Sequence, residues 1–452
     1  MKQGSPDLIH GEIRRAIEQF ALPFMFASLL QSIYGAVDLF VVGQYADSAA
    51  VSAVSIGSQL MQLVTMVING LAMGGTVEIG NRIGEGNDRG VSRAVGNITV
   101  IFCLLALVLT PVMLLGTDLL VSLMQTPAEA VPDCRRYMLV CSAGLPFITG
   151  YNAVSGIYRG IGDSKTPVRF VGIACAINVV LDFVLTGFFG LGAIGAAYAT
   201  TFSQVISFLL ALVHMKRGGF RFRLTQEDLK PEGRIMRRIL KVGFPLAVQD
   251  ALVHFSFLAI SAIINTLGLV ASAAVGVSEK LMGFVFLIPG AFGSAVATAV
   301  AQNLGAGKRE RTTEALKWGV LYSVCCGVLV CLLCLIIPRT LIGIFSRDAD
   351  VIAAGATYIA SYSIDCILTG FVFCINGYLN GNGKSMICFA HSMAATFLVR
   401  IPLTWLLSKI SSGMNLLPMG FAAPAASLLS ILICVIYLGR MRGKRPLKEV
   451  SP

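Results

Sequence analysis

Long apolar stretches alternate with short polar ones along almost the whole chain. Twelve of these stretches reach the length of about 20 apolar residues that an α-helix needs to cross a bilayer. Their approximate cores are 20–42, 51–79, 95–115, 137–158, 167–189, 194–214, 240–267, 270–300, 316–337, 351–379, 386–407 and 416–438. Prolines within four of them predict kinks, at Pro23, Pro146, Pro245 and Pro289. The pattern predicts an all-α integral membrane protein with twelve transmembrane helices.

The chain also repeats itself across a polar stretch at its midpoint. Three segments recur about 221–222 residues later: 21–30 at 243–252, 81–89 at 302–310, and 156–165 at 377–386. Two of the three lie in Gly-rich polar loops, so chance similarity between apolar segments cannot explain the repeat. A six-helix unit duplicated in one orientation gives two lobes related by an axis along the membrane normal. We expect an N-lobe over 1–215, a cytosolic linker over 216–239 and a C-lobe over 240–452.

Composition and charge agree with a membrane protein. Hydrophobic residues make up 56% of the chain and charged residues 13%, against about 25% charged in soluble domains. The net charge of +11 matters through its placement: 28 of the 35 Lys and Arg residues fall on the side that holds both ends of the chain. We expect a multi-pass plasma-membrane protein with cytoplasmic termini, no cleavable signal peptide and no nucleic-acid partner.

The sequence contains no motif that indicates an enzyme or a bound cofactor. The segment 190–197 matches the dinucleotide pattern G-x-G-x-x-G, but it lies in a tight turn between two membrane helices, not after a strand. A phosphate-binding P-loop pattern is absent from the sequence. The pair Cys331 and Cys334 lies inside an apolar stretch and indicates helix packing. We expect no enzyme activity, no cofactor and no resident metal centre.

Two acids interrupt the apolar stretches of the first half. Asp38 lies fifteen residues after Pro23, and Asp182 lies fifteen residues after Pro167. Both helices run outwards, so each carboxylate lies roughly 22 Å along its helix from the proline. The acids therefore share a depth in the membrane. A charged Asp at the bilayer centre costs about 2.5–3.5 kcal/mol, so each needs a partner, a pore or a proton.

Two further polar residues complete a candidate cation site. Asn178 lies one turn from Asp182 on the same helix. Thr200 lies about 12 Å along the next helix from Gly192. Carboxylate, amide and hydroxyl oxygens suit a hard monovalent cation, and two carboxyl groups in one apolar pocket also favour a proton. A hydrogen-bonded structural cluster is the alternative. The equivalents of the two acids in the second half are Ile260 and Leu403, so we expect ion coupling in the first half alone.

Other polar residues inside the apolar stretches are weaker candidates. Those expected to line a substrate cavity are Gln31, Tyr34, Gln204, Asp250, His254 and Asp365. Asp250 and His254 are four residues apart and can pair on one helix face. Arg400 is expected to pair or to extend to an interface. Glu78 lies near a helix end and is expected to be solvated.

Several short patterns occur in a fixed order. They are Pro23, Asp38 and Gly43 in the first helix, Gly-Glu-Gly-Asn-Asp and Gly-Ala-Gly-Lys-Arg after the second and eighth, Tyr-Arg-Gly-Ile-Gly-Asp-Ser-Lys-Thr-Pro at 158–167, Asn178 with Asp182, 196–200, and Arg-Ile-Pro-Leu at 400–403. Together they resemble the multidrug and toxic compound extrusion (MATE) family over roughly residues 15–440.

The resemblance implies a V-shaped central cavity between two six-helix lobes. It implies export of cationic, amphipathic compounds in exchange for H⁺ or Na⁺, with the cation at Asp38, Asn178, Asp182 and Thr200. It also implies a hinge at Pro23 in the DinF-like branch. The segment 249–254 lacks the glutamate of the NorM-like branch, so a DinF-like or related bacterial branch fits better.

We therefore expect a monomeric secondary antiporter in membrane lipid that works on organic cations by alternating access. The first alternative is a lipid-linked oligosaccharide flippase of the same superfamily. It needs basic residues around its cavity to hold a pyrophosphate, and only Lys280 and Arg400 lie well inside the predicted helices, away from their ends. A membrane scaffold or receptor without transport is the second alternative. It gives no reason for the paired acids.

Overall fold

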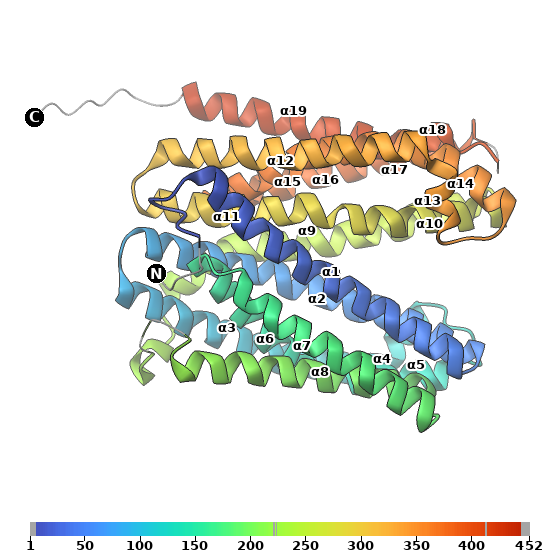
Figure 1. The fold of residues 1–452 in the computed structure, drawn as a ribbon, viewed down its shortest axis with the longest axis horizontal. Helices are drawn as coiled ribbons and strands as arrows, with labels where there is room; N and C mark the ends of the chain where they lie inside the picture. Colours follow the sequence, from blue (N-terminus) through green and yellow to red (C-terminus); the bar gives the residue numbers. More distant parts are fainter. Residues whose placement is uncertain (1–5, 220–221, 223, 412–413, 444–452) are drawn as a thin grey trace, which may run out of the picture. The chain divides into compact units, whose positions relative to one another are not determined.

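The computed structural model describes residues 6–219, 222, 224–411 and 414–443, and every regular element among them is a helix (Figure 1). The α-helices are α1 (Ile13–Tyr45), α2 (Ser48–Gly84), α3 (Asp88–Leu115), α4 (Thr117–Leu123), α5 (Val131–Ala143), α6 (Leu145–Ile161), α7 (Lys165–Asp182), α8 (Gly192–His214), α9 (Gly233–Asn265), α10 (Leu269–Val285), α11 (Leu287–Gly305), α12 (Arg309–Ile336), α13 (Pro338–Gly343), α14 (Ala349–Tyr362), α15 (Ile364–Gly381), α16 (Ser385–Ala394), α17 (Ile401–Ser408), α18 (Leu417–Gly420) and α19 (Ala422–Gly443). Three π-helical turns, η1 (Phe183–Phe188), η2 (Met215–Gly219) and η4 (Ala395–Arg400), and one 3₁₀ turn, η3 (Gln226–Leu229), complete the elements. The all-α prediction is confirmed.

The membrane spans also follow the sequence pattern. Eleven helical segments among the described residues are long and apolar enough to cross a membrane, and the bent pair α5 and α6 makes up to twelve. These two helices meet at 48°, beside Pro146, as the predicted kink requires. A break between α10 and α11 likewise precedes Pro289. In contrast, α1 and α9 continue through Pro23 and Pro245 as single helices.

The chain divides into two compact units. Unit 1 holds Met1–Ala251, Ser294–Ala315 and Asn380–Gly383, and unit 2 holds Leu252–Gly293, Leu316–Leu379 and Lys384–Pro452. Unit 1 therefore combines the first half of the sequence with the end of α11 and the start of α12.

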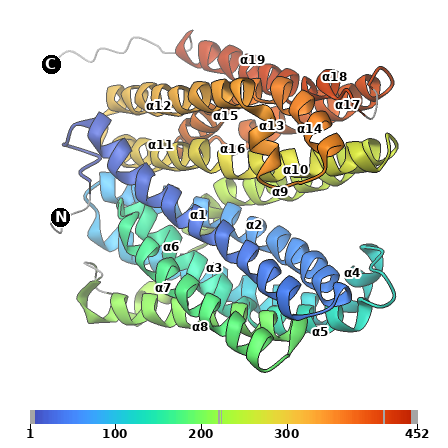
Figure 2. The same ribbon diagram turned by 45° about the vertical axis from the view of Figure 1, so that its right-hand side comes forward.

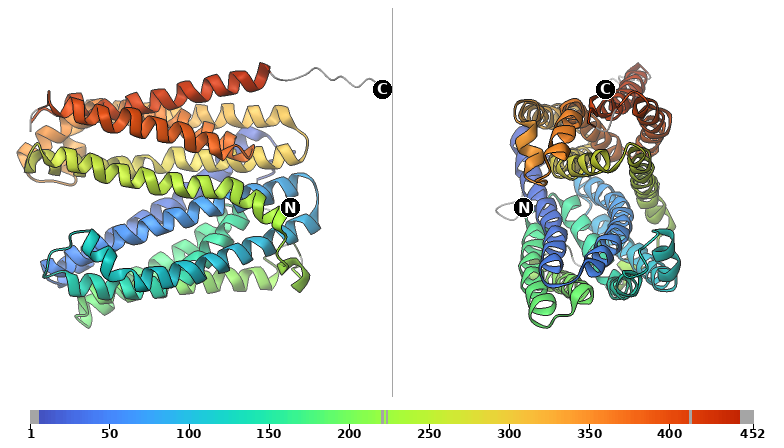
Figure 3. Two further views of the ribbon diagram at one scale, coloured as in Figure 1. Left: turned by 180° about the vertical axis from the view of Figure 1, so that it is seen from behind. Right: turned by 90° about the vertical axis from the view of Figure 1, so that its right-hand side faces the viewer.

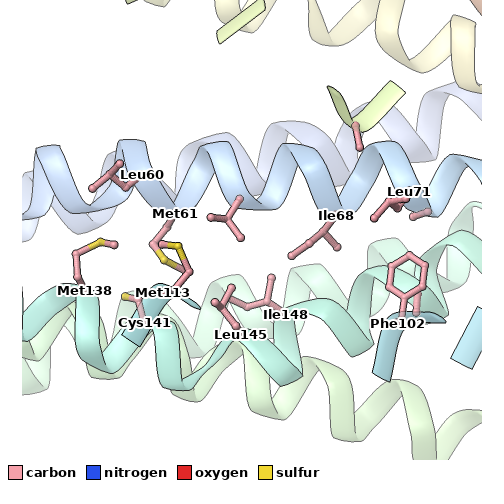
Figure 4. Packing of buried hydrophobic residues seen from close by; sticks show 14 of the residues in the cluster. Leu60, Met61, Ile68, Leu71, Phe102, Met113, Met138, Cys141, Leu145 and Ile148 are labelled. Atoms are coloured by element: carbon pink, nitrogen blue, oxygen red, sulfur yellow. The ribbon is translucent and has the colours of Figure 1, made fainter. Parts of the chain in front are cut away.

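Helix α2 packs along α5 and α6 in the core of unit 1. Figure 4 shows its side chains facing theirs: Leu60, Met61, Ile68 and Leu71 from α2, and Met138, Cys141, Leu145 and Ile148 from α5 and α6. The backbones approach closely where Gly156 of α6 faces α2, because the Thr76 hydroxyl donates a 2.9 Å hydrogen bond to the Gly156 carbonyl. Small residues permit such approaches between membrane helices.

The first described residues of unit 1 form a strap, Asp7–Gly11, that lies against the loop after α11. Side chains of this later segment donate to strap carbonyls: Asn303 Nδ2 to Leu8 at 2.8 Å, Lys308 Nζ to Ile9 at 3.1 Å and Arg311 Nη2 to Gly11 at 2.6 Å. The Leu8 side chain is 1% exposed. The strap is thus fixed by both apolar burial and hydrogen bonds.

Glu78, near the end of α2, corrects one expectation from the sequence. It is 5% exposed rather than solvated. Arg82, one turn later, pairs with its carboxylate at 2.9 Å, and Arg238 of α9 pairs with the same oxygen at 3.5 Å. A buried acid is tolerated when cations compensate it, and here a helix far along the sequence supplies the second cation.

Unit 2 has its own core. Helices α10, α13, α14 and α18 pack together at one end of it, and α16 and η4 pack on α19 (Figures 1 and 3). Gly327 allows α12 to approach α15, because a Cβ atom at Gly327 would lie 2.3 Å from the Cys366 carbonyl oxygen.

Candidate cation site

Helices α1, α7 and α8 pack against one another in unit 1, and Figure 2 shows α1 running alongside α7. Asp38 lies in the C-terminal third of α1, Asn178 and Asp182 lie in the last two turns of α7, and Thr200 lies in α8. At Asp182 the α-helix gives way to the wider π-turn η1. Single π-turns of this kind occur frequently at functional sites.

The four residues predicted to form a cation site come together. The Thr200 hydroxyl donates a 2.8 Å hydrogen bond to Oδ2 of Asp38. Asp182 and Asn178 lie within interaction distance of the same carboxyl group. Three helices therefore contribute side chains to one cluster.

Three of these side chains are buried, and most of their polar atoms have no hydrogen-bond partner among the described residues. Asp38 is 4% exposed, and Asn178 and Asp182 are 0% exposed. Oδ1 of Asp38, both polar side-chain atoms of Asn178 and both carboxyl oxygens of Asp182 lack a hydrogen-bond partner among the described residues. Leaving a buried polar group unsatisfied costs about 1–3 kcal/mol, so the cluster is chemically suited to bind a proton or a small hard cation.

Two further hydroxyl groups, on Tyr34 and Ser203, form hydrogen bonds beside Thr200. The Tyr34 hydroxyl, one turn before Asp38, donates to the Thr200 carbonyl at 3.0 Å and lies 2.5 Å from Oγ of Ser203. Ser203 Oγ donates to the same carbonyl at 2.8 Å. The structure thus places Tyr34 beside the cation cluster. Ser203, which is fully buried, was not identified from the sequence.

The other predicted cavity residues lie elsewhere on their helices. Gln31 is exposed on α1, and Gln204 is half-buried on α8. Asp250 and His254 lie one turn apart on α9, where unit 1 ends after Ala251 and unit 2 begins. Among the described residues of unit 1, Gln31, Gln204 and Asp250 form no hydrogen bond with Asp38.

Asp365 belongs to a separate buried cluster in unit 2. It is 5% exposed, and its Oδ1 has no hydrogen-bond partner among the residues described. The Arg400 guanidinium lies 4.3 Å from the centre of the Phe257 ring and donates a long, 3.5 Å hydrogen bond to the Tyr362 hydroxyl. A cation–π contact of this kind stabilises the charge of a partly buried arginine.

The described residues contain no cluster of side chains typical of a metal centre. Within residues 6–219, 222, 224–411 and 414–443, no group of three or more His, Cys, Asp and Glu side chains could hold a metal ion. All twelve cysteines are free thiols. The cluster on α1, α7 and α8 therefore combines only two acids with one amide and one hydroxyl.

A family model named MatE matches the chain twice, over residues 23–184 and 245–406. These matches cover well over half of the sequence. The chain belongs to the MatE family. The second match begins and ends 222 residues after the first, which agrees with the predicted duplication.

Named relatives of this MatE chain extend over most of its length. It is 26% identical over 404 residues to the probable multidrug resistance protein YpnP of Bacillus subtilis strain 168, covering 89% of this chain and 90% of the relative. It is 27% identical over 407 residues to the probable multidrug resistance protein NorM of Thermotoga maritima, covering 88% and 86%.

Solved structures share the MatE fold. An outward-facing multidrug resistance MATE family transporter of the MOP superfamily matches with a TM-score of 0.90 at 20% identity, covering 98% of both chains. A MOP superfamily transporter from Pyrococcus furiosus, described as having a binding pocket of reverse polarity, matches with a TM-score of 0.87 at 20% identity, covering 96% and 97%. The predicted fold, an all-helical membrane protein of about twelve spans, is confirmed.

Proposed function

We propose that this MatE protein is a secondary antiporter that exports cationic, amphipathic small molecules in exchange for H⁺ or Na⁺. The observation that carries the proposal is the set of buried polar atoms on Asp38, Asn178 and Asp182 that have no hydrogen-bond partner among the described residues. A coupling ion drives transport only if it binds two states of the protein with different affinity. Ligands divided among α1, α7 and α8 meet this condition, because any shift of α1 changes their separation. The names of the relatives, multidrug resistance proteins, support the substrate class.

Pro23 is the proposed hinge of this movement. Proline has no backbone N–H, so the Gln19 carbonyl one turn earlier lacks its helical donor. A helix weakened at that point can bend at little cost. Because Pro23 and Asp38 share α1, ion binding at the acid is coupled to the hinge through one helix.

The proposal also covers the branch of the family, the orientation in the membrane and the oligomeric state. The absence of a glutamate from 249–254 favours a DinF-like or related bacterial branch. The excess of Lys and Arg on one side favours cytoplasmic termini in the plasma membrane. We assign one repeat to each lobe, over 1–215 and 240–452, joined by the linker 216–239. A monomer then contains the complete pathway.

Efflux from proteoliposomes tests this function. A fluorescent organic cation is loaded, and a pH gradient or a Na⁺ gradient is imposed separately on wild type, Asp38→Asn and Asp182→Asn. Asp118→Asn is the matched control, because Asp118 is an exposed acid paired with Arg135 at the surface. We expect one gradient to drive efflux, with both site variants slowed at least about tenfold, equivalent to about 1.4 kcal/mol.

Two results would contradict the proposal. Full gradient-driven efflux in both site variants would remove the coupling role of the acids. Gradient-independent dye movement in wild type would remove the antiport mechanism itself.

A further inference from the structure

Unit 1 carries an apolar groove outside the candidate cation site. Its volume is about 780 Å³. Helices α3 and α8 both pack on α6 but have no close packing with each other, so α6 forms the floor between two walls. Representative lining residues are Phe102, Ala106 and Leu107 from α3, Gly150 and Ala153 from α6, and Leu212 from α8.

The groove has a closed end, formed by the segment 224–229 that includes η3. The Asp228 carbonyl oxygen lies directly over Gly96 of α3, where a Cβ atom would be 1.9 Å away. Just beyond, the Glu232 amide donates a 2.8 Å hydrogen bond to Asn97 Oδ1. The segment 224–232 therefore folds onto α3 and closes the end of the groove.

The long side of the groove opens onto apolar surface. Leu104 and Val108 are exposed on α3, and Leu209 and Val213 are exposed on α8. Both helices are membrane spans, so these side chains contact lipid hydrocarbon. The opening between them faces the same environment, which makes an acyl chain its natural occupant.

Two basic residues lie beside the closed end, which also carries the acids Glu227 and Asp228. Lys216 and Arg217 follow directly after Met215, which lines the groove, and both are exposed. Neither forms an ion pair with the residues that the structure describes. The carboxylate of Asp228 at this end is already bound by the Thr225 hydroxyl at 2.8 Å and the Thr225 amide at 2.9 Å. Basic residues at a cytosolic membrane surface attract anionic headgroups.

We propose that this groove binds one anionic phospholipid, with its acyl chains along α6 and its phosphate beside Lys216 and Arg217. The volume lies within the range of about 300–1,000 Å³ found for ligand pockets. The inference does not depend on the proposed antiport, since it uses none of the cation-site residues.

Two cysteines provide the test within one molecule. Cys103 lines the groove and is exposed, and Cys325 is exposed on α12 in unit 2. Delipidated protein in detergent is treated with N-ethylmaleimide, and labelling of each cysteine is followed by mass spectrometry as phosphatidylglycerol or phosphatidylcholine is added. We expect phosphatidylglycerol to slow labelling of Cys103 about fivefold or more, and to leave Cys325 unchanged. Equal slowing of both cysteines, or of neither, overturns the proposal.

Variants locate the bound lipid. Ala106→Trp fills the groove, whereas Leu104→Trp adds the same ring to an exposed position on α3 that does not line it. Native mass spectrometry should show one retained phosphatidylglycerol in wild type and in Leu104→Trp, and none in Ala106→Trp. The double variant Lys216→Gln, Arg217→Gln should retain phosphatidylglycerol no better than phosphatidylcholine. Equal retention of the two lipids by wild type overturns the headgroup assignment, and retention by Ala106→Trp overturns the site.

Discussion

The Thr200 hydroxyl and the Asp38 carboxylate are joined by a 2.8 Å hydrogen bond between α8 and α1. The other oxygen of Asp38, Oδ1, has no hydrogen-bond partner among the described residues. One half of this carboxyl group is thus fixed by the protein, and the other half is open to a ligand. Thr200 orients the acid without saturating it.

Replacing Thr200 by valine tests this orientation, because valine keeps the shape and removes the donor. We expect Thr200→Val to destabilise the folded protein by about 1–3 kcal/mol, the cost of an unsatisfied buried polar group. Thr200→Ser keeps the hydroxyl and is the matched control. Thermal unfolding in detergent measures both variants. If valine and serine shift the midpoint equally, the hydrogen bond contributes nothing to stability.

Gly84 sets the separation of α2 from α11 in unit 1. A Cβ atom there would lie 2.0 Å from the Gln302 carbonyl oxygen, so Gly84→Ala forces the two backbones apart. We expect a loss of about 1–3 kcal/mol, as for other overpacked cores. Gly276→Ala on α10 is the control, because a Cβ atom there meets nothing within 4 Å. A melting temperature for Gly84→Ala as high as that of the control would show that the contact is not tight.

Arg311 anchors the strap directly and also through Asn303, which itself donates to the strap. Its Nη2 donates to the Gly11 carbonyl at 2.6 Å, and its Nε donates to Asn303 Oδ1 at 3.1 Å. Lysine cannot make both bonds in that geometry. We expect Arg311→Lys to accelerate amide exchange in the strap, since charged hydrogen bonds contribute about 1.5–3 kcal/mol each. Arg309→Lys, at an exposed neighbour, should leave exchange unchanged. Equal exchange in the two variants would contradict this anchoring role.

Asp7 gives the strap a pH dependence. Burial tends to raise the pKa of its carboxyl, but hydrogen bonds from the His10 and Ile9 amides outweigh this and hold the pKa below the ordinary value of 3.8. The stabilisation is therefore fully present above that pH and is lost as the pH falls through the lowered pKa. We expect the Ile9 and His10 amides to be protected from exchange at pH 6 and unprotected in Asp7→Ala. Protection in wild type that persists at pH 2 would count against this role.

Much of the cation cluster could be predicted from the sequence. Asp38 and Asp182 stand out because an acid in an apolar helix is costly, and equal distances from a proline place both at one depth. Ser203 carries no such signal, since a serine in a helix commonly bonds its own backbone. Its role depends on Tyr34 of α1, which lies 169 positions away.

The burial of Glu78 also could not be predicted from the sequence. Its position near a helix end indicates solvation, yet Arg238 of α9 covers it. A pairing across 160 positions leaves no trace in local hydropathy. The prolines also differ from one another: Pro146 accompanies a bend, while α1 continues through Pro23 as one helix, because packing decides whether a weakened turn opens.

The strap also bears on how the chain is made. The hydrogen bond between Leu8 and Asn303 spans 295 positions, so the first described residues cannot dock until the loop after α11 has left the ribosome. At about 5–20 residues per second, that delay is roughly 15–60 seconds. During this delay the Leu8 side chain does not have its buried position, and the strap is not yet docked. The strap therefore reaches its final position only after α11 has been made.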